Sequence, residues 1–217
     1  MIHLSRVTKL DGVRSWSTPS GTTCPGSFNS DGSLVDACTG CYAKSGNYHR
    51  PNVKQPREEN KLDWKRDGWV DDMVNELFYD RFFRWFDSGD IYHPEQARKI
   101  LEVIKRTDWV LHWLPTRSHK RPKILPILEE INQLPNVAVR YSSDSVLGEY
   151  EPHHGSTIIP TTETDDPNLT VCEAYANKDG KCNRCIKCWD KSISTIAYVA
   201  HGRSMKALIK RKGIAVE

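Results

Sequence analysis

Residues 82–114, FFRWFDSGDIYHPEQARKILEVIKRTDWVLHWL, decide the fold class of this 217-residue chain. The stretch opens with an apolar and aromatic run from Phe82 to Phe86, which has the length and composition of a buried strand. Pro94 fits the first turn of a helix, and the apolar residues that follow it recur at helical spacing. Trp109 to Leu114 is a second buried run. A strand, a helix and a strand in this order predict a βαβ unit with parallel strands.

The same alternation extends to both sides of this unit. Residues 70–78 carry one apolar stripe at the spacing of a helix, directly before the first strand. After the second strand, Ile124 to Leu134 predicts a helix, with Pro126 in its first turn or at a kink, and Val137 to Tyr141 predicts a third strand. Three strands separated by helices indicate an α/β fold, with a parallel sheet and right-handed crossovers.

The rest of the chain has a different character. Residues 1–60 are dense in glycine and proline, which predicts a loop-rich segment with room only for short strands such as Val13 to Ser17. We expect a single domain over residues 1–217, made of this loop-rich segment, a βα core over 68–150 and a C-terminal segment over 151–217.

Composition and charge exclude some functions. No apolar run approaches the roughly 20 residues that span a bilayer, and the first residues lack a signal peptide's apolar stretch. These features predict a cytoplasmic protein without a membrane partner. A net charge of +3 over 217 residues does not by itself argue for a nucleic-acid partner.

Polar segments follow each of the three predicted strands. They are Asp87-Ser88-Gly89-Asp90, Thr116-Arg117-Ser118-His119-Lys120 and Ser142-Ser143-Asp144-Ser145. The carboxyl ends of parallel strands form the ligand-binding edge of α/β folds, so all three segments are expected at one face. Arg117 and Lys120 suit a phosphate or carboxylate, and Asp87 and Asp90 suit either acid-base chemistry or helix capping.

The seven cysteines fall into two groups, with 130 residues free of cysteine between Cys41 and Cys172. Near the C-terminus, Cys182, Cys185 and Cys188 form C-x2-C-x2-C, and Cys172 precedes them. Ferredoxins use such a run with a remote fourth cysteine to hold a [4Fe-4S] cluster. Structural zinc more often uses two separate C-x2-C pairs, so zinc remains an alternative, as do unmetallated thiols.

The N-terminal group is Cys24, then thirteen residues, then Cys38-x2-Cys41. Three thiolates can hold a four-iron cluster and leave one iron free for a small molecule or substrate. The seven cysteines then divide as three plus four, giving two clusters. Alternatively, a cysteine of this group joins the C-terminal group in one site that links the two ends of the chain. In either arrangement the metal stabilises segments with little core of their own.

Histidines and the basic tail are further candidates. His153-His154 and His201 are possible metal ligands, although a lone histidine is more often a core or surface residue. The tail from Lys206 to Lys212 is most simply a solvated basic helix end, with nucleic-acid contact as the other interpretation. The sequence contains no phosphate-binding GxxxxGK[ST] loop, no GxGxxG turn after a strand and no GxSxG elbow.

Several of these motifs in their order resemble the phage "gene product 88" family. They are Ser17-Thr-Pro-Ser-Gly21 leading into Thr23-Cys24-Pro25-Gly26, then Cys38-x2-Cys41-Tyr42-Ala43, Phe83-Arg84-Trp85-Phe86-Asp87-Ser88-Gly89-Asp90, Thr116-Arg117-Ser118, and the late cysteine cluster ending in Cys188-Trp189. The resemblance covers most of the chain. It implies a bacteriophage protein, located in the cytoplasm of the host cell, and it implies no particular reaction.

A more distant resemblance is to radical SAM enzymes, in which a cysteine triad ending in Cys-Tyr-Ala precedes a partial (β/α) barrel. That resemblance implies a reduced partial TIM barrel here, with Cys24, Cys38 and Cys41 as the triad that binds a four-iron cluster. S-adenosylmethionine would chelate the free iron. Ser88-Gly89-Asp90 would match the turn that binds the methionine amino group.

The sequence therefore leaves two alternative functions, one as a redox or radical protein and one as a structural binding module. The first is an iron-sulfur protein with redox or radical SAM chemistry on an unknown small-molecule or macromolecular substrate, served by an electron donor. In it Asp90 and Arg117 orient the bound molecule, and all seven cysteines bind metal. The second is a zinc-stabilised structural module that contacts nucleic acid or a host protein through the basic tail.

Overall fold

The computed structural model describes residues 1–177 and 179–215, and its largest element is a five-stranded, mostly parallel sheet. The strands lie in the order β1 (Leu4–Val7), β2 (Val13–Trp16), β3 (Phe82–Trp85), β4 (Leu111–Thr116) and β5 (Val137–Tyr141). β1 pairs antiparallel with β2, and every other pair is parallel. The three predicted strands are thus confirmed as β3, β4 and β5, lying side by side and parallel.

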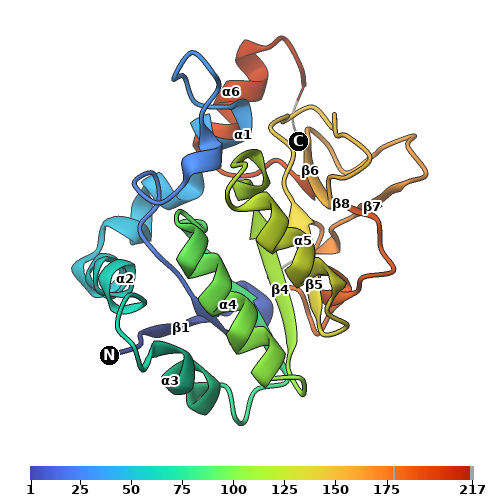
Figure 1. Cartoon of the computed structure of the whole chain (residues 1–217). Helices are drawn as coiled ribbons and strands as arrows, with labels where there is room; N and C mark the ends of the chain where they lie inside the picture. The colour runs from blue at the N-terminus through green and yellow to red at the C-terminus, as the bar shows by residue number, and fades with distance from the viewer. Residues whose placement is uncertain (178, 216–217) are drawn as a thin grey trace.

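The predicted crossover helices are also confirmed. They are α3 (Trp69–Glu76), α4 (Pro94–Arg106) and α5 (Leu125–Gln133), and prolines stand in the first turns of α4 and α5. Figure 1 shows α4 and α5 side by side across one face of the sheet, with α3 near the lower end of α4. The main hydrophobic core lies between these helices and the strand residues that point toward them, such as Trp16, Phe83, Trp85 and Leu114. Mixed α/β architecture therefore agrees with the sequence.

The opposite face of the sheet is covered by the cysteine-bearing C-terminal segment instead of by helices. Alternation along β3 and β4 directs Phe82 and Trp113 to this second face. There they pack with Trp189, and Leu10, Cys182 and Cys188 complete the small apolar cluster. Leu10, from the N-terminal part of the chain, thus packs against the cysteine-bearing C-terminal segment on this face of the sheet.

A second, three-stranded sheet lies beyond β5 and was not predicted. Its strands are β6 (Ser156–Ile159), β8 (Thr195–Val199) and β7 (Leu169–Val171), in that order and parallel. A parallel bridge between Ser142 and Ser156 joins the end of β5 to the start of β6. The short strands are separated by irregular segments, so neither helical nor alternating periodicity marks them.

The expectation that residues 1–60 hold only loops and short strands is wrong over the last part of that segment. α1 (Asp36–Thr39) is a single turn, and α2 (Pro51–Asp63) is a helix of 13 residues. α2 lacks an apolar stripe because the residues that it buries are Arg57 and Asn60. Asn60 hydrogen-bonds the backbone of His3 and Ser17, so this helix is held by polar contacts.

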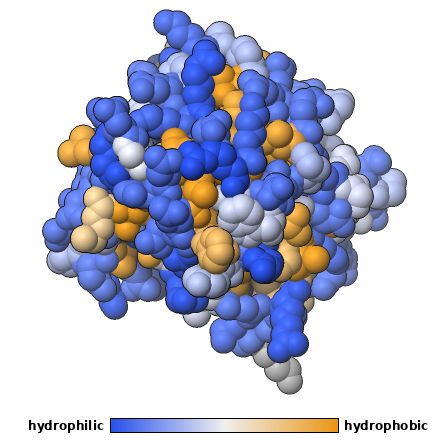
Figure 2. Space-filling model, turned by 60° about the horizontal axis from the view of Figure 1, so that its bottom comes forward, coloured by the Kyte–Doolittle hydropathy of each residue, from blue (hydrophilic) through white to orange (hydrophobic). Residues whose placement is uncertain are grey.

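The chain ends in α6 (Arg203–Arg211), which packs beside α1 at one end of the sheet (Figure 1). In residues 1–177 and 179–215, no helix has the length and apolar character needed to cross a membrane. Figure 2 shows a mainly hydrophilic face at the other end, with apolar atoms in small separate groups. Exposed aromatic side chains include Phe78 and Tyr79, which directly follow α3.

Candidate metal and substrate site

A cavity of about 430 Å³ lies at the carboxyl ends of the parallel strands. Residues from all three predicted strand-end segments line it, among them Asp90, Arg117 and Ser143. Both cysteine groups line it too, the first through Cys24, Cys38 and Cys41 and the second through Cys172, Cys182 and Cys188. Segments far apart in the sequence therefore line one cavity, and the strand order predicts this for the three strand-end segments.

The turn after β3 is fixed by close backbone packing. Gly89 has a φ of +75°, and a Cβ atom there would lie 2.1 Å from Oγ1 of Thr18. Only glycine adopts this conformation without strain, and only glycine fits this space. Arg57 of α2 donates to Oγ of Ser88 at 2.8 Å, so the turn is also held from the side of the helix.

The two aspartates of this turn are both engaged by the protein. Arg57 Nη2 donates to Oδ2 of Asp87 at 2.8 Å, and Ser17 donates to Oδ1 of the same carboxylate. Asp90 is buried; its Oδ1 accepts from Thr116 Oγ1 at 2.6 Å, and its Oδ2 accepts from the Arg117 amide at 2.8 Å. Burial raises the pKa of Asp90, while these hydrogen bonds oppose the rise. Asp90 thus positions the backbone of Arg117.

Arg117 connects the strand-end segments to one another. Its Nη2 donates to the carbonyl oxygen of Ser143 at 2.6 Å, and its Nε lies 3.4 Å from Asp144. A Cβ on Gly26 would lie 2.1 Å from the Arg117 carbonyl oxygen, so the segment after Cys24 packs directly on this residue. The guanidinium is half-buried at the cavity wall.

The N-terminal triad sits above this edge on short turns. Cys24 precedes a 3-10 turn, η2 (Pro25–Ser27), Cys38 lies in α1, and Cys41 precedes η3 (Tyr42–Lys44). Burial raises the pKa of the Cys24 thiol to about 12, with further contributions from Asp90 and the other two thiols. α6 closes this side, because Met205 packs within about 3.0 Å of where a Cβ on Gly40 would stand.

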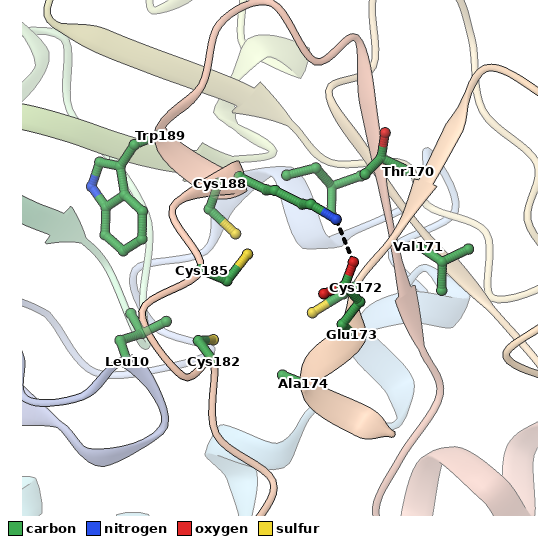
Figure 3. Close-up of a pocket in the computed structure, with 12 residues that line it drawn as sticks. Leu10, Thr170, Val171, Cys172, Glu173, Ala174, Cys182, Cys185, Cys188 and Trp189 are labelled. Carbon is green, nitrogen blue, oxygen red and sulfur yellow. Dashed lines mark hydrogen bonds and ion pairs between the residues drawn. The ribbon is translucent and has the colours of Figure 1, made fainter. Parts of the chain in front are cut away.

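The C-terminal tetrad surrounds a smaller space next to the cavity. Figure 3 shows the sulfur atoms of Cys172, Cys182, Cys185 and Cys188 facing this space from the end of β7 and from the loop before η7 (Lys187–Trp189). Burial raises the pKa of Cys182 to about 11, and the neighbouring thiols Cys172 and Cys188 add to the rise. All four cysteines are free and partly buried.

The tetrad loop is anchored to the second face of the sheet. The guanidinium of Arg140, in β5, donates to the backbone carbonyls of Lys187, Cys188, Asp190, Ile193 and Ser194. Trp189 Nε1 donates to the carbonyl oxygen of Phe83 at 2.9 Å. Tyr198 Oη lies 3.5 Å from Cys188 Sγ. The Arg140 side chain therefore provides the hydrogen-bond donors for five backbone carbonyls in and after the turn that carries Cys188.

Two guanidinium groups place positive charge beside this thiol. Arg84 lies over the Trp113 ring, 4.5 Å from its centroid, and lines the cavity. Both Arg84 and Arg140 lower the pKa of Cys188, which burial raises. Among the described residues neither guanidinium forms an ion pair within 4.0 Å, although Asp87 interacts with the charge of Arg84 and Asp190 with that of Arg140. The charge available here suits an anionic group between the cysteines.

The thiols stand further apart than a single zinc ion requires. Four sulfurs bound tetrahedrally at about 2.3 Å lie about 3.8 Å from one another. Across residues 1–177 and 179–215, the one group of three with all ligand atoms within 4.8 Å is His119, His153 and His154, and no cysteine belongs to it. The thiols within each cysteine group are nevertheless close enough to influence one another's pKa.

A family model described as Gene product 88 matches residues 5–191, which is most of the chain. The chain belongs to the phage gene product 88 family. The resemblance expected from the sequence motifs is therefore confirmed. No curated protein and no solved structure matches the chain.

The residues matched by the gene product 88 model include most of the site but not α6. All seven cysteines lie inside residues 5–191, together with the strand-end segments and Arg140. α6 lies outside it, although Leu208 and Ile209 bury against the α1 region. The basic tail is thus part of the packing around the triad, and Lys212 pairs with Asp36 of α1 at 2.7 Å.

The structure brings most predicted site residues together and separates a few. Ser88, Gly89, Asp90 and Arg117 share the cavity with six of the cysteines, and Cys185 faces the smaller space. Lys120 turns away and pairs with Asp144, while His201 lines the cavity near α6. Sequence reasoning missed Arg84 and Arg140. The signal that could have found them is a charged residue inside an otherwise apolar strand, Arg84 in Phe82 to Phe86 and Arg140 in Val137 to Tyr141.

Proposed function

We propose that this phage protein binds iron-sulfur clusters at both cysteine groups. Cys172, Cys182, Cys185 and Cys188 would supply all four thiolates of one [4Fe-4S] cluster. Cys24, Cys38 and Cys41 would hold a second cluster with one iron open to the cavity. The observation that carries this proposal is that both cysteine groups contribute to the lining of one cavity.

The charges around the thiols support an anionic centre. Without a bound cation the buried thiols are protonated at neutral pH, because burial raises the pKa of Cys24, Cys38, Cys182 and Cys188. Metal binding displaces such protons. The cluster with its four thiolates is anionic, and Arg84 and Arg140 offer the compensating charge on the side of Cys188.

The sequence spacing favours a cluster over zinc as the occupant of the C-terminal group, because ferredoxins use a C-x2-C-x2-C run with a remote fourth cysteine, whereas structural zinc more often uses two separate C-x2-C pairs. A four-iron cluster spreads its ligands over four separate metal atoms. The alternative of a zinc module that contacts nucleic acid through the tail also loses support, because α6 packs its apolar face on the triad segment.

The cavity would hold the substrate, with Arg117 as the group that contacts it. Asp90 would act through Arg117, since its carboxylate holds the Arg117 amide. The Ser88-Gly89-Asp90 turn lines the same space, so S-adenosylmethionine, bound by the open iron and this turn, is one candidate ligand. The parallel bridge from β5 to β6 supports a reduced partial barrel of the radical SAM kind.

A bound four-iron cluster supplies electrons one at a time. An external donor would reach the tetrad, whose cysteines are all partly exposed. The chain's own residues then have three tasks: Trp113 and Trp189 shield the tetrad from the sheet side, Arg117 orients the substrate, and Met205 covers the triad.

Iron and sulfide analysis of single-cysteine variants, purified without oxygen, tests this proposal. Cys188→Ala is expected to lose the iron of the tetrad, about four atoms per chain, and to keep the rest. Cys41→Ala is expected to lose the iron of the triad while the tetrad keeps its own. Ser27→Ala is the matched control, since Ser27 lines the cavity beside Cys24 and carries no thiol.

Two results would contradict the proposal. One is wild-type protein that takes up neither iron nor sulfide, even when both are supplied under reducing conditions. The other is an equal loss of iron in Ser27→Ala and Cys188→Ala, which would place the metal elsewhere. Circular dichroism of each variant separates the loss of a cluster from the loss of the fold.

A further inference from the structure

Three histidines meet outside the cavity, at the edge where β4 and β5 end. His119 lies in the 3-10 turn η5 (Ser118–Lys120), just after β4. His153 and His154 directly precede Gly155, whose amide donates to the carbonyl oxygen of Tyr141 at 2.8 Å. This bond and the Ser142–Ser156 bridge bring the two histidines to the end of β5.

The three imidazoles converge closely. One ring nitrogen from each lies within 4.8 Å of the other two. The ring centroids of His153 and His154 are 4.3 Å apart, and His119 lies 5.8 Å from the first and 5.5 Å from the second. His119 also stacks on the Tyr141 ring at 4.8 Å, which restrains its orientation.

The surroundings of this histidine group favour a bound cation. Nδ1 of His119 is buried and has no hydrogen-bond partner among the described residues. Burial, together with a smaller effect of the two neighbouring imidazoles, lowers the pKa of His119 to about 4. Burial also lowers the pKa of His154, whereas the nearby Asp144 and Glu151 carboxylates oppose that shift.

We propose that His119, His153 and His154 bind one divalent transition-metal ion of the zinc class. Zn–N bonds of about 2.0–2.1 Å place tetrahedral ligand nitrogens about 3.4 Å apart, so the rings need to move by only about an ångström. Three imidazoles leave a fourth position open, and the exposed His153 places that position at the protein surface. The site contains no thiol and lines neither cysteine space, so it is independent of the iron-sulfur proposal.

Binding has a structural consequence at the loop before β6. The Glu151 amide donates to Nδ1 of His154 at 2.9 Å, so the neutral ring carries its proton on Nε2. A metal bound at Nε2 requires that proton to leave and Nδ1 to carry one. The Glu151 amide then loses its acceptor, and its chemical shift reports occupation of the site.

Titration with Co²⁺ under anaerobic conditions tests the site in the full chain. We expect one bound ion whose ligand-field absorption appears without a thiolate-to-cobalt charge-transfer band, because nitrogen ligands give no such band. Zn²⁺ should displace it. His153→Ala should weaken this binding by at least about tenfold, since loss of even an outer-shell partner of a metal ligand costs that much.

Matched variants keep the test decisive. His153 is exposed, so its replacement leaves the fold intact, and His119→Ala should have the same effect on cobalt affinity. His3→Ala is the control, because His3 faces Glu59 at the other end of the chain. Cobalt binding that persists unchanged in His153→Ala and His119→Ala would overturn the proposal. So would a spectrum that shows thiolate ligation alone.

Discussion

Replacing Arg140 by methionine removes the anchor of the tetrad loop while keeping a similar volume. The guanidinium donates to five backbone carbonyls between Lys187 and Ser194, at distances from 2.5 to 3.3 Å. It is 3% exposed and has no carboxylate partner among the described residues, so these carbonyls hold it in place. Methionine would leave them without a donor, and the turn that carries Cys188 would open.

The expected cost follows from the number and kind of these bonds. A hydrogen bond from a charged donor contributes about 1.5–3 kcal/mol, but five bonds to one group are not additive. Half of the residues from 187 to 194 are exposed, so some of the freed carbonyls regain water, and removal of the buried charge offsets part of the loss. We expect the free energy of unfolding to fall by about 3–5 kcal/mol in Arg140→Met, together with loss of the metal bound by the tetrad.

Urea unfolding followed by tryptophan fluorescence measures the first quantity, because Trp113 and Trp189 lie under the loop. Arg140→Lys is the matched variant: it keeps the charge but reaches fewer carbonyls, so it should lose about 1–3 kcal/mol and part of the metal. A loss below about 1 kcal/mol in Arg140→Met, with metal content unchanged, would refute this account of how the loop is held.

Three further predictions concern stability and the site. His112 is buried, and burial lowers its pKa to about 3, whereas a histidine in the unfolded chain has a pKa of about 6.5. Its contribution to the free energy of unfolding should therefore be constant above about pH 6.5 and fall by about 1.4 kcal/mol per pH unit below it, in addition to the contributions of His119 and His154, whose pKa values are also lowered. Denaturant unfolding at several pH values below about 6.5 should show a slope smaller by about 1.4 kcal/mol per unit in His112→Gln than in the wild type, and equal slopes would contradict this. Gly89→Ala should lower the free energy of unfolding by about 2–4 kcal/mol, because the new Cβ meets Thr18. Gly32→Ala, also at positive φ but in open space, should lower it by about 1 kcal/mol. Equal melting temperatures for the two variants would contradict the packing argument. Ile209→Ala should lower the free energy of unfolding by about 2–4 kcal/mol and reduce the iron bound by the triad, because α6 buries Ile209 beside the triad segment. An unchanged iron content would show that α6 does not support the triad.

The core of the fold was predictable because its elements are long and periodic. β3, β4 and β5, with α4 and α5 between them, carry buried runs and helical stripes in regular alternation. α2 escaped prediction because it buries Arg57 and Asn60, and no hydrophobic pattern marks a helix held by polar bonds. The second sheet escaped because β7 has only three residues and pairs with β8 alone, which lies beyond the cysteine-bearing loop in the sequence.

The candidate site was predictable as a set of residues but not as an arrangement. Cysteine spacing identified two groups, and the strand order placed Asp90 and Arg117 at one edge. The sequence contained no sign that the tetrad covers the second face of the sheet, because that contact depends on Trp189 and Arg140. His119 could be joined to His153 and His154 only once the β5–β6 bridge was known.

The most direct test of the central claim is metal analysis of the wild-type chain, purified without oxygen, for iron, acid-labile sulfide and zinc. We expect about eight irons per chain with matching sulfide, and a coloured protein. Zinc at the histidine group is compatible with this result. A colourless protein that contains no iron, and whose zinc is released when the cysteines are replaced, would contradict the account.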